Sequence, residues 1–128
     1  LTTSRRTPDT FLAALQAAQP ANLNIVKHED IPKGWLPDFL GHSEKAWVTE
    51  DSVSMVYEAL TAGAATGILT IRRRKSSKVS RCLDEQARAG TLTPFPEWAD
   101  GKSLSPPSET FDEADRCAEW VYRNWIKS

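Results

Sequence analysis

Short apolar runs alternate along this chain with longer segments in which apolar residues recur at helical spacing. Residues 46–49 and 66–71 form two such runs, and each is typical of a buried strand. Between them, residues 52–62 have helical spacing and end at Gly63, a residue that commonly stops a helix. Further strand segments are expected at residues 1–3, 23–26 and 92–95. Further helices are expected to begin at Pro8, after the basic turn at 72–78, and at Thr110.

Strands that alternate with helices of this length predict βαβ units, right-handed crossovers and a parallel sheet. The expected fold class is therefore α/β, a three-layer Rossmann-like parallel sheet with helices on both faces. In such folds ligands bind outside the carboxyl ends of the strands. This rule selects three loops that follow strands, at residues 4–7, 49–54 and 72–78.

The last helix is the longest in this prediction. Thr110 and Glu113 have the spacing of a capping box at its start. We expect its apolar stripe to pack against the core. The stripe consists of Phe111, Ala114, Ala118, Val121, Tyr122 and Trp125.

Composition narrows the class of protein. With 128 residues, 40% apolar residues, 26% charged residues and a net charge of −1, the chain suits one soluble globular domain without general attraction to nucleic acid. It has no signal peptide and no apolar run long enough to span a membrane, so we expect a cytoplasmic protein. Cys82 and Cys117 are expected to be buried, reduced thiols. Because the chain begins with Leu1 rather than methionine, and residues 1–3 resemble the end of a strand, we expect a single domain, residues 1–128, that is a fragment of a larger protein.

The segment around residue 52 carries the main candidate chemistry. A helix that begins at the edge of a parallel sheet directs its free N–H groups and its dipole at an anion. Thr49 or Asp51 can cap this helix, Ser52 and Ser54 can donate to a phosphate, and Glu58 can accept hydrogen bonds from a ribose. One face of the helix is shared by Asp51, Ser54, Met55 and Glu58. In the alternative interpretation, Asp51 and Ser52 are only caps and Glu58 is a solvated side chain.

Two basic turns and one histidine are further candidates. Ser4, Arg5 and Arg6 precede a predicted helix, and arginine suits bidentate recognition of phosphate. The run at 72–75, which includes Lys75, suits substrate phosphate, nucleic acid or anionic lipid, but it also suits plain solubility. His28 follows a predicted strand and is a candidate base.

Several classes of site are not supported by the sequence. No spacing of histidine or cysteine fits a metal site, and neither a Gly-x-Gly-x-x-Gly motif nor a Walker loop is present. We therefore expect no metal and no cofactor. Basic and aromatic residues are not interleaved, so we expect no nucleic-acid partner.

Residues 3–8 and 48–59 together resemble the mitochondrial fission ELM-type family, and the resemblance extends to about Phe95. It implies that the chain is the C-terminal half of a two-domain protein of the GT-B type, as in nucleotide-sugar glycosyltransferases. It also implies that Ser52 and Ser54 contact a diphosphate, that Glu58 contacts ribose, and that residues 4–6 face the cleft between the domains.

Three hypotheses follow from these residues. In the first, the chain binds a nucleotide-diphosphate sugar for glycosyl transfer, and this half alone binds the donor without turnover. In the second, it is a non-catalytic scaffold of the family that recruits protein partners or anionic lipid, which leaves contact with a membrane surface open. In the third, it is a nucleotide-sugar epimerase whose acid–base pair comes from His28, Glu29 and Asp30.

Overall fold

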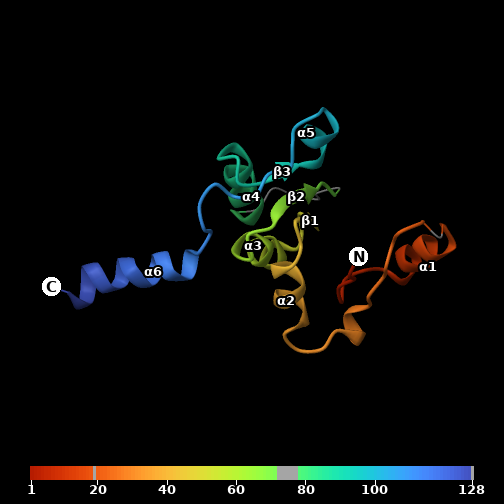
Figure 1. The fold of residues 1–128 in the computed structure, drawn as a ribbon, viewed down its shortest axis with the longest axis horizontal. Coiled ribbons are helices and arrows are strands. Elements are labelled where there is room, and N and C mark those ends of the chain that lie inside the picture. Colours follow the sequence, from red (N-terminus) through yellow and green to blue (C-terminus); the bar gives the residue numbers. More distant parts are fainter. Residues whose placement is uncertain (19, 72–77, 128) are drawn as a thin grey trace. The chain divides into compact units, whose positions relative to one another are not determined.

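The computed structural model describes residues 1–18, 20–71 and 78–127, and Figure 1 shows the order of the elements along the chain. The chain divides into two compact units, Leu1–Leu36 and Pro37–Ser128, which are described separately. The boundary falls within helix α2 (Trp35–Gly41).

The first unit contains an α-helix, a short 3-10 helix and an isolated strand-like contact. Helix α1 (Asp9–Ala18) confirms the predicted helix after Pro8. Thr2 and Val26 form an isolated parallel bridge, in which the Val26 N–H donates to Leu1 O at 2.9 Å and the Thr3 N–H donates to Val26 O at 3.2 Å. The prediction of a buried strand over residues 23–26 is therefore wrong in extent, because only one residue pairs and Val26 is half-buried. The 3-10 helix η1 (His28–Asp30) follows directly.

The second unit contains a parallel sheet in the order β1-β2-β3. The three strands are β1 (Lys45–Thr49), β2 (Ala65–Leu69) and β3 (Thr93–Pro94). They are joined by helices α3 (Val53–Thr61) and α4 (Lys78–Arg88). A parallel sheet flanked by helices confirms the predicted α/β class. Gly63 ends α3 with a φ of +81°, a conformation that glycine adopts without steric cost.

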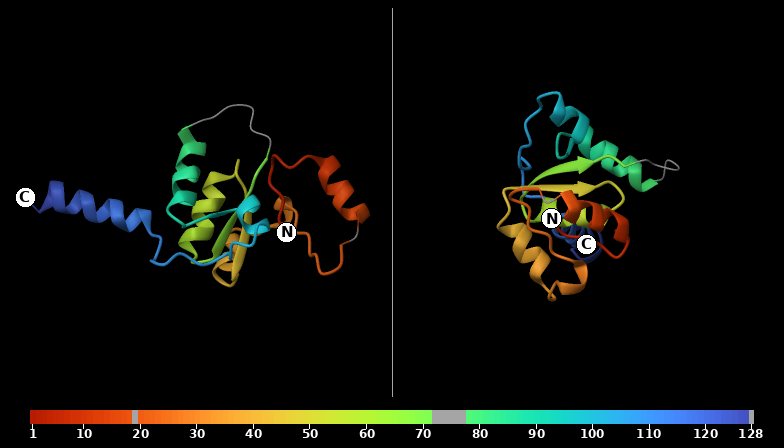
Figure 2. Two further views of the ribbon diagram at one scale, coloured as in Figure 1. Left: turned by 90° about the horizontal axis from the view of Figure 1, so that it is seen from above. Right: turned by 90° about the vertical axis from the view of Figure 1, so that its right-hand side faces the viewer.

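The core of this unit lies between the sheet and helices α3 and α4, which are on the same side of the strands in Figures 1 and 2. Val56, Ala59 and Leu60 of α3 have no exposed surface at all. Ala46 and Val48 of β1 are also buried and are separated by one residue, as expected for side chains on one face of a strand. Val56 and Leu60 are four residues apart, so their burial confirms the helical spacing predicted over residues 52–62.

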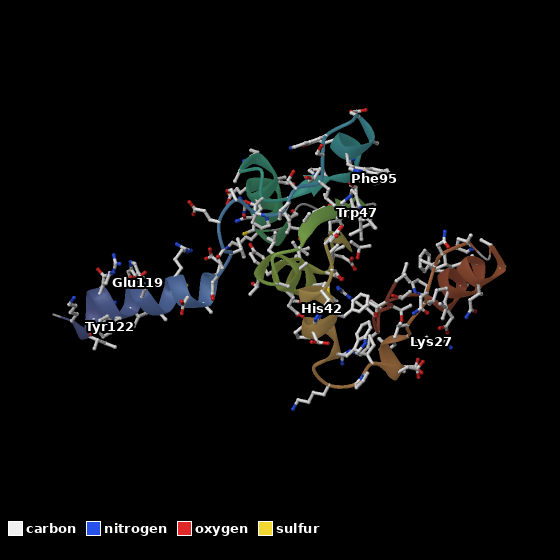
Figure 3. The ribbon with its side chains drawn as sticks, viewed as in Figure 1. Lys27, His42, Trp47, Phe95, Glu119 and Tyr122 are labelled. Atoms are coloured by element: carbon white, nitrogen blue, oxygen red, sulfur yellow. The ribbon has the colours of Figure 1, made fainter. Side chains whose placement is uncertain are left out.

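The opposite face of the sheet carries an aromatic cluster of Trp47, Phe95 and Trp98. Trp47 packs edge-on against Phe95 and Trp98, with ring centroids 5.8 and 5.3 Å away, and Figure 3 shows Trp47 and Phe95 side by side. Phe95 and Trp98 belong to helix α5 (Phe95–Ala99), which lies on this side of the strands. The strand expected over residues 92–95 is therefore too long, because the chain turns into α5 after two residues and Pro96 suits a first helical turn.

Helix α6 (Glu113–Val121) and the π-helical turn η2 (Tyr122–Ile126) confirm the last predicted helix but not its packing. None of their described residues is buried, and the Trp125 side chain is 71% exposed. Helical spacing predicts that a helix has an apolar side, but it does not predict whether another part of the chain packs against that side. The predicted capping box is also wrong, because Asp112 is the N-cap and its Oδ1 accepts from the Asp115 N–H at 3.0 Å.

Both cysteines differ from their expected surroundings. Cys82 on α4 and Cys117 on α6 are free thiols, as expected, but both are exposed rather than buried. Helix α4 buries Leu83 against the core, whereas the preceding residue, Cys82, is exposed.

Candidate functional site

The strongest candidate site is the turn between β1 and α3 at the carboxyl edge of the sheet. The Ser52 N–H donates to Thr49 O at 2.9 Å, which closes the turn, and the Val56 N–H donates to Ser52 O at 3.1 Å. The N–H groups of Val53, Ser54 and Met55 therefore belong to the first helical turn, where no acceptor exists within the helix. These three amides, rather than that of Ser52, are the donors that this end of α3 can present to an anion.

The predicted ligand-facing residues of α3 lie on its outer side. Asp51, Ser54 and Glu58 are exposed, and Ser52 and Met55 are half-buried. Thr49 is half-buried at the end of β1. This arrangement matches the exposed helical face expected from the spacing of Asp51, Ser54 and Glu58.

Glu50 is a buried charged residue at this turn that the sequence pattern did not indicate as a candidate. Its side chain is only 7% exposed, although it directly follows a strand at the edge of the sheet. Its Oε1 accepts from the Ile71 N–H at 3.0 Å, so the carboxylate links the ends of β1 and β2. The only available signal was a charged residue at the end of an apolar run, which is also common on protein surfaces.

In the first unit, hydroxyl groups hold residues 4–7 in a tight turn. The Thr7 N–H donates to Ser4 O at 3.0 Å, the Ser4 N–H to Thr7 Oγ1 at 2.9 Å, and the Arg6 N–H to Ser4 Oγ at 3.2 Å. Arg5 and Arg6 lie at the exposed positions of this turn. The turn is therefore ordered locally, and the prediction that it faces the α3 site remains a prediction.

His28 lies close to the same turn. Its backbone N–H donates to Thr3 Oγ1 at 3.0 Å, and its Nδ1 is 3.5 Å from that oxygen. The structure thus brings together His28 and the residue that precedes Ser4, as expected for two neighbouring strand ends. Lys75, the remaining candidate, lies outside the described residues, as does the rest of the basic run at 72–77.

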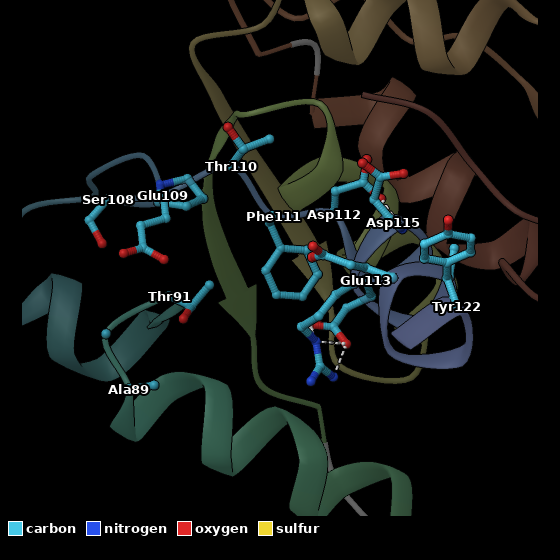
Figure 4. A pocket seen from close by; sticks show the side chains of 15 residues that line it. Ala89, Thr91, Ser108, Glu109, Thr110, Phe111, Asp112, Glu113, Asp115 and Tyr122 are labelled. Atoms are coloured by element: carbon cyan, nitrogen blue, oxygen red, sulfur yellow. Dashed lines mark hydrogen bonds and ion pairs between the residues drawn. The ribbon is translucent and has the colours of Figure 1, made fainter. Parts of the chain in front are cut away.

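A hollow of about 870 Å³ lies elsewhere, between the end of α4, residues 107–112 and one side of α6 (Figure 4). It lies near the amino ends of the strands, away from the first turn of α3. Five carboxylates line it, those of Glu109, Asp112, Glu113, Asp115 and Glu119. Arg116, which also lines it, is hydrogen-bonded to Glu113. Because this lining would repel a diphosphate, the hollow does not suit the predicted ligand.

Beside this hollow, Phe111 joins the start of α6 to the core of the second unit. Its ring centroid is 5.6 Å from that of Tyr57 on α3. Burial raises the pKa of the Tyr57 hydroxyl above its ordinary value, and Cys82, Glu113 and Glu85 raise it further by electrostatic repulsion. Tyr57 therefore stays neutral in the ordinary pH range and acts as a packing residue.

Two other kinds of site are absent from the described part of the chain. Residues 1–18, 20–71 and 78–127 include no group of three or more histidine, cysteine or acidic side chains able to hold a metal ion. No helix within the same ranges has both the length and the apolar character needed to cross a bilayer.

The family of this chain follows from a match to a known family model. A family model described as mitochondrial fission ELM1 matches residues 1–125. The chain belongs to this family. Membership in the mitochondrial fission ELM1 family confirms the resemblance expected from residues 3–8 and 48–59, and the match extends through α6. The comparisons found no match among curated proteins and none among solved structures.

Proposed function

We propose that this chain is the donor-binding domain of a GT-B-type, glycosyltransferase-like protein and that it binds a nucleotide-diphosphate sugar. The observation that carries the proposal is the first turn of α3, which β1 delivers to the carboxyl edge of a parallel sheet with Ser54 exposed. This is the edge at which α/β folds bind their ligands.

The diphosphate would lie against the N–H groups of Val53, Ser54 and Met55, with the hydroxyls of Ser52 and Ser54 as further donors. Glu58 lies one turn beyond Ser54 on the exposed side of α3, where its carboxylate could accept from both ribose hydroxyls.

Arg5 and Arg6 are proposed to add positive charge from the turn at residues 4–7. In glycosyl transfer, an acceptor hydroxyl oxygen forms a bond to the anomeric carbon of the sugar and gives up its proton to a general base. The bond between the sugar and the diphosphate breaks, and negative charge develops on the leaving diphosphate. Helix-end amides and guanidinium groups stabilise that charge. In a two-domain protein of the GT-B type, a general base from the N-terminal domain would complete the reaction, so this chain alone is expected to bind the donor without turnover.

Calorimetric titration with uridine diphosphate and guanosine diphosphate tests the proposal. Replacing Ser54 with aspartate should weaken binding of the nucleotide diphosphate about tenfold or more, because the new carboxylate lies where the phosphates bind. The same substitution should preserve the fold, because an acidic residue in the first turn of a helix interacts favourably with the helix dipole.

The matched control is Thr61→Asp, which adds the same charge at an exposed position in the last turn of α3. This variant should bind as the wild type does, although the charge there disfavours the helix slightly. If neither nucleotide diphosphate produces heat at low millimolar concentration, or if the two variants weaken binding equally, the proposed site is wrong.

A second candidate function is a non-catalytic scaffold that recruits protein partners or anionic lipid. The exposed tryptophans of α6 and η2 favour it, since Trp120 is 59% exposed and Trp125 is 71% exposed. Large exposed apolar side chains of this kind often mark interaction surfaces.

Reversing the charges of Arg72, Arg73 and Arg74 to glutamate tests the lipid branch of this candidate. The affinity for vesicles that contain phosphatidylserine, measured by co-sedimentation, should fall about a hundredfold. Each basic residue near such a surface contributes about 1 kcal/mol. Binding of uridine diphosphate should stay unchanged if the two functions are separate. Vesicle binding that is indifferent to the reversal would contradict the lipid branch.

A further inference from the structure

Glu50 continues the pairing of β1 with β2 in two different ways. Its backbone N–H donates to Leu69 O at 3.1 Å, which extends the parallel ladder one residue beyond Thr49. In a regular parallel ladder, the carbonyl of the same residue would next accept from the Ile71 N–H. Here the side-chain Oε1 of Glu50 accepts that hydrogen bond instead, at 3.0 Å.

This exchange occurs just beyond the last registered pair of the two strands, Thr49 and Leu69. After Thr49 the backbone turns away, and the hydrogen bond from the Ser52 N–H to Thr49 O closes the turn that leads into α3. The Glu50 carboxylate replaces the Glu50 backbone carbonyl as the acceptor. The N–H of Ile71, just after β2, therefore keeps a hydrogen-bond partner. Because the Glu50 side chain is only 7% exposed, water competes little for this hydrogen bond.

We propose that Glu50 is a positioning residue for the diphosphate site, because its carboxylate fixes the turn between β1 and α3 against the end of β2. Helix α3 begins three residues after Glu50, at Val53. The hydrogen bond between Glu50 and Ile71 therefore helps to fix the position of the amide donors in the first turn of α3. The ligand-binding part of the inference rests on the proposed function. The link between the strand ends does not, because it is a property of the protein without ligand.

The chemistry of the link predicts which replacements preserve it. Glutamine has the same length and keeps an acceptor oxygen at the same position, so Glu50→Gln should retain the hydrogen bond from Ile71. Alanine removes the acceptor and leaves the Ile71 N–H without it. A residue that supports a binding site in this way typically affects ligand affinity without touching the ligand.

The experiment compares Glu50→Ala and Glu50→Gln with Leu92→Ala, a control that removes a buried side chain at the other end of the sheet. Calorimetry with uridine diphosphate measures affinity, and hydrogen exchange followed by NMR measures protection of the Ile71 amide. We expect Glu50→Ala to weaken binding about tenfold and to speed Ile71 exchange about tenfold relative to Leu92→Ala. Glu50→Gln should restore both to within about twofold of the wild type.

The outcomes separate the inference from the proposed function. If the wild type binds nucleotide diphosphate and Glu50→Ala affects neither affinity nor Ile71 exchange beyond the Leu92→Ala control, the positioning role is wrong. It is also wrong if Glu50→Gln is as impaired as Glu50→Ala. If the wild type binds no nucleotide diphosphate, the proposed function fails, and Ile71 exchange in the same variants still decides whether Glu50 holds the strand ends together.

Discussion

Replacing Gly67 with alanine should lower the free energy of unfolding by about 3 kcal/mol, the upper part of the range for overpacking a core. A Cβ at this position would lie 2.3 Å from Cε3 and Cζ3 of Trp47, its partner in the register of β1 and β2. The ring has little freedom to move aside, because Phe95 and Trp98 pack against it edge-on. Urea unfolding followed by circular dichroism measures the effect.

A double-mutant cycle identifies the cause of this loss. In a Trp47→Ala background, Gly67→Ala should cost less than about 1 kcal/mol, because the ring that excludes the Cβ is gone. Gly41→Ala is the matched control, since a Cβ there meets nothing within 4 Å, and it should leave stability unchanged or raise it by up to about 1 kcal/mol. An equal cost of Gly67→Ala with and without the Trp47 ring would contradict the steric explanation.

Truncating Leu60 to alanine should lower the free energy of unfolding by roughly 3–4 kcal/mol. Leu60 is among the largest side chains of the chain that have no exposed surface, and it lies on α3 beside the buried Val56 and Ala59. The loss combines two contributions, the hydrophobic free energy of burying the removed carbon atoms and the cost of the cavity that they leave. Equilibrium unfolding in urea measures it.

The control for Leu60→Ala is Val121→Ala on α6. The Val121 side chain is 44% exposed, so its truncation should change stability by no more than about 0.5 kcal/mol. Comparable losses for the two variants would show that α6 is packed in solution and that its side chains are not exposed as described. If Leu60→Ala left the free energy of unfolding unchanged, the assignment of Leu60 to the core would be wrong.

The segment from β1 to β2 could be predicted closely from the sequence. Its apolar runs are short, its helix has clear spacing, and Gly63 marks the end of that helix. These are local signals, so they need no knowledge of what packs where. The outer face of α3 followed from the same spacing, which is why Asp51, Ser54 and Glu58 are exposed as expected.

Features that depend on contacts between distant segments were predicted poorly. The stripe of α6 was recognised, but whether a surface covers it is not encoded in its spacing. Helix α5 was missed because Pro94 and Pro96 favour extended structure when read alone, whereas Pro96 here stands in a first helical turn. Glu50 was missed because its role depends on a hydrogen bond with Ile71, a residue that follows β2 and is distant in the sequence.

The family match extends the sequence-based interpretation over nearly the whole chain without assigning chemistry to it. Ser54 and Arg5 lie in different compact units, so their joint action on one ligand stays a prediction. The Ser54→Asp and Thr61→Asp pair tests the α3 part of that prediction alone.

The packing of Trp47 over Gly67 has a consequence for how this sheet can vary during evolution. Positions 47 and 67 share the volume of a single indole ring, and that ring now comes entirely from β1. A relative can gain bulk at position 67 only by losing it at position 47. The two sites are therefore free to exchange their sizes, but neither can drift independently of the other.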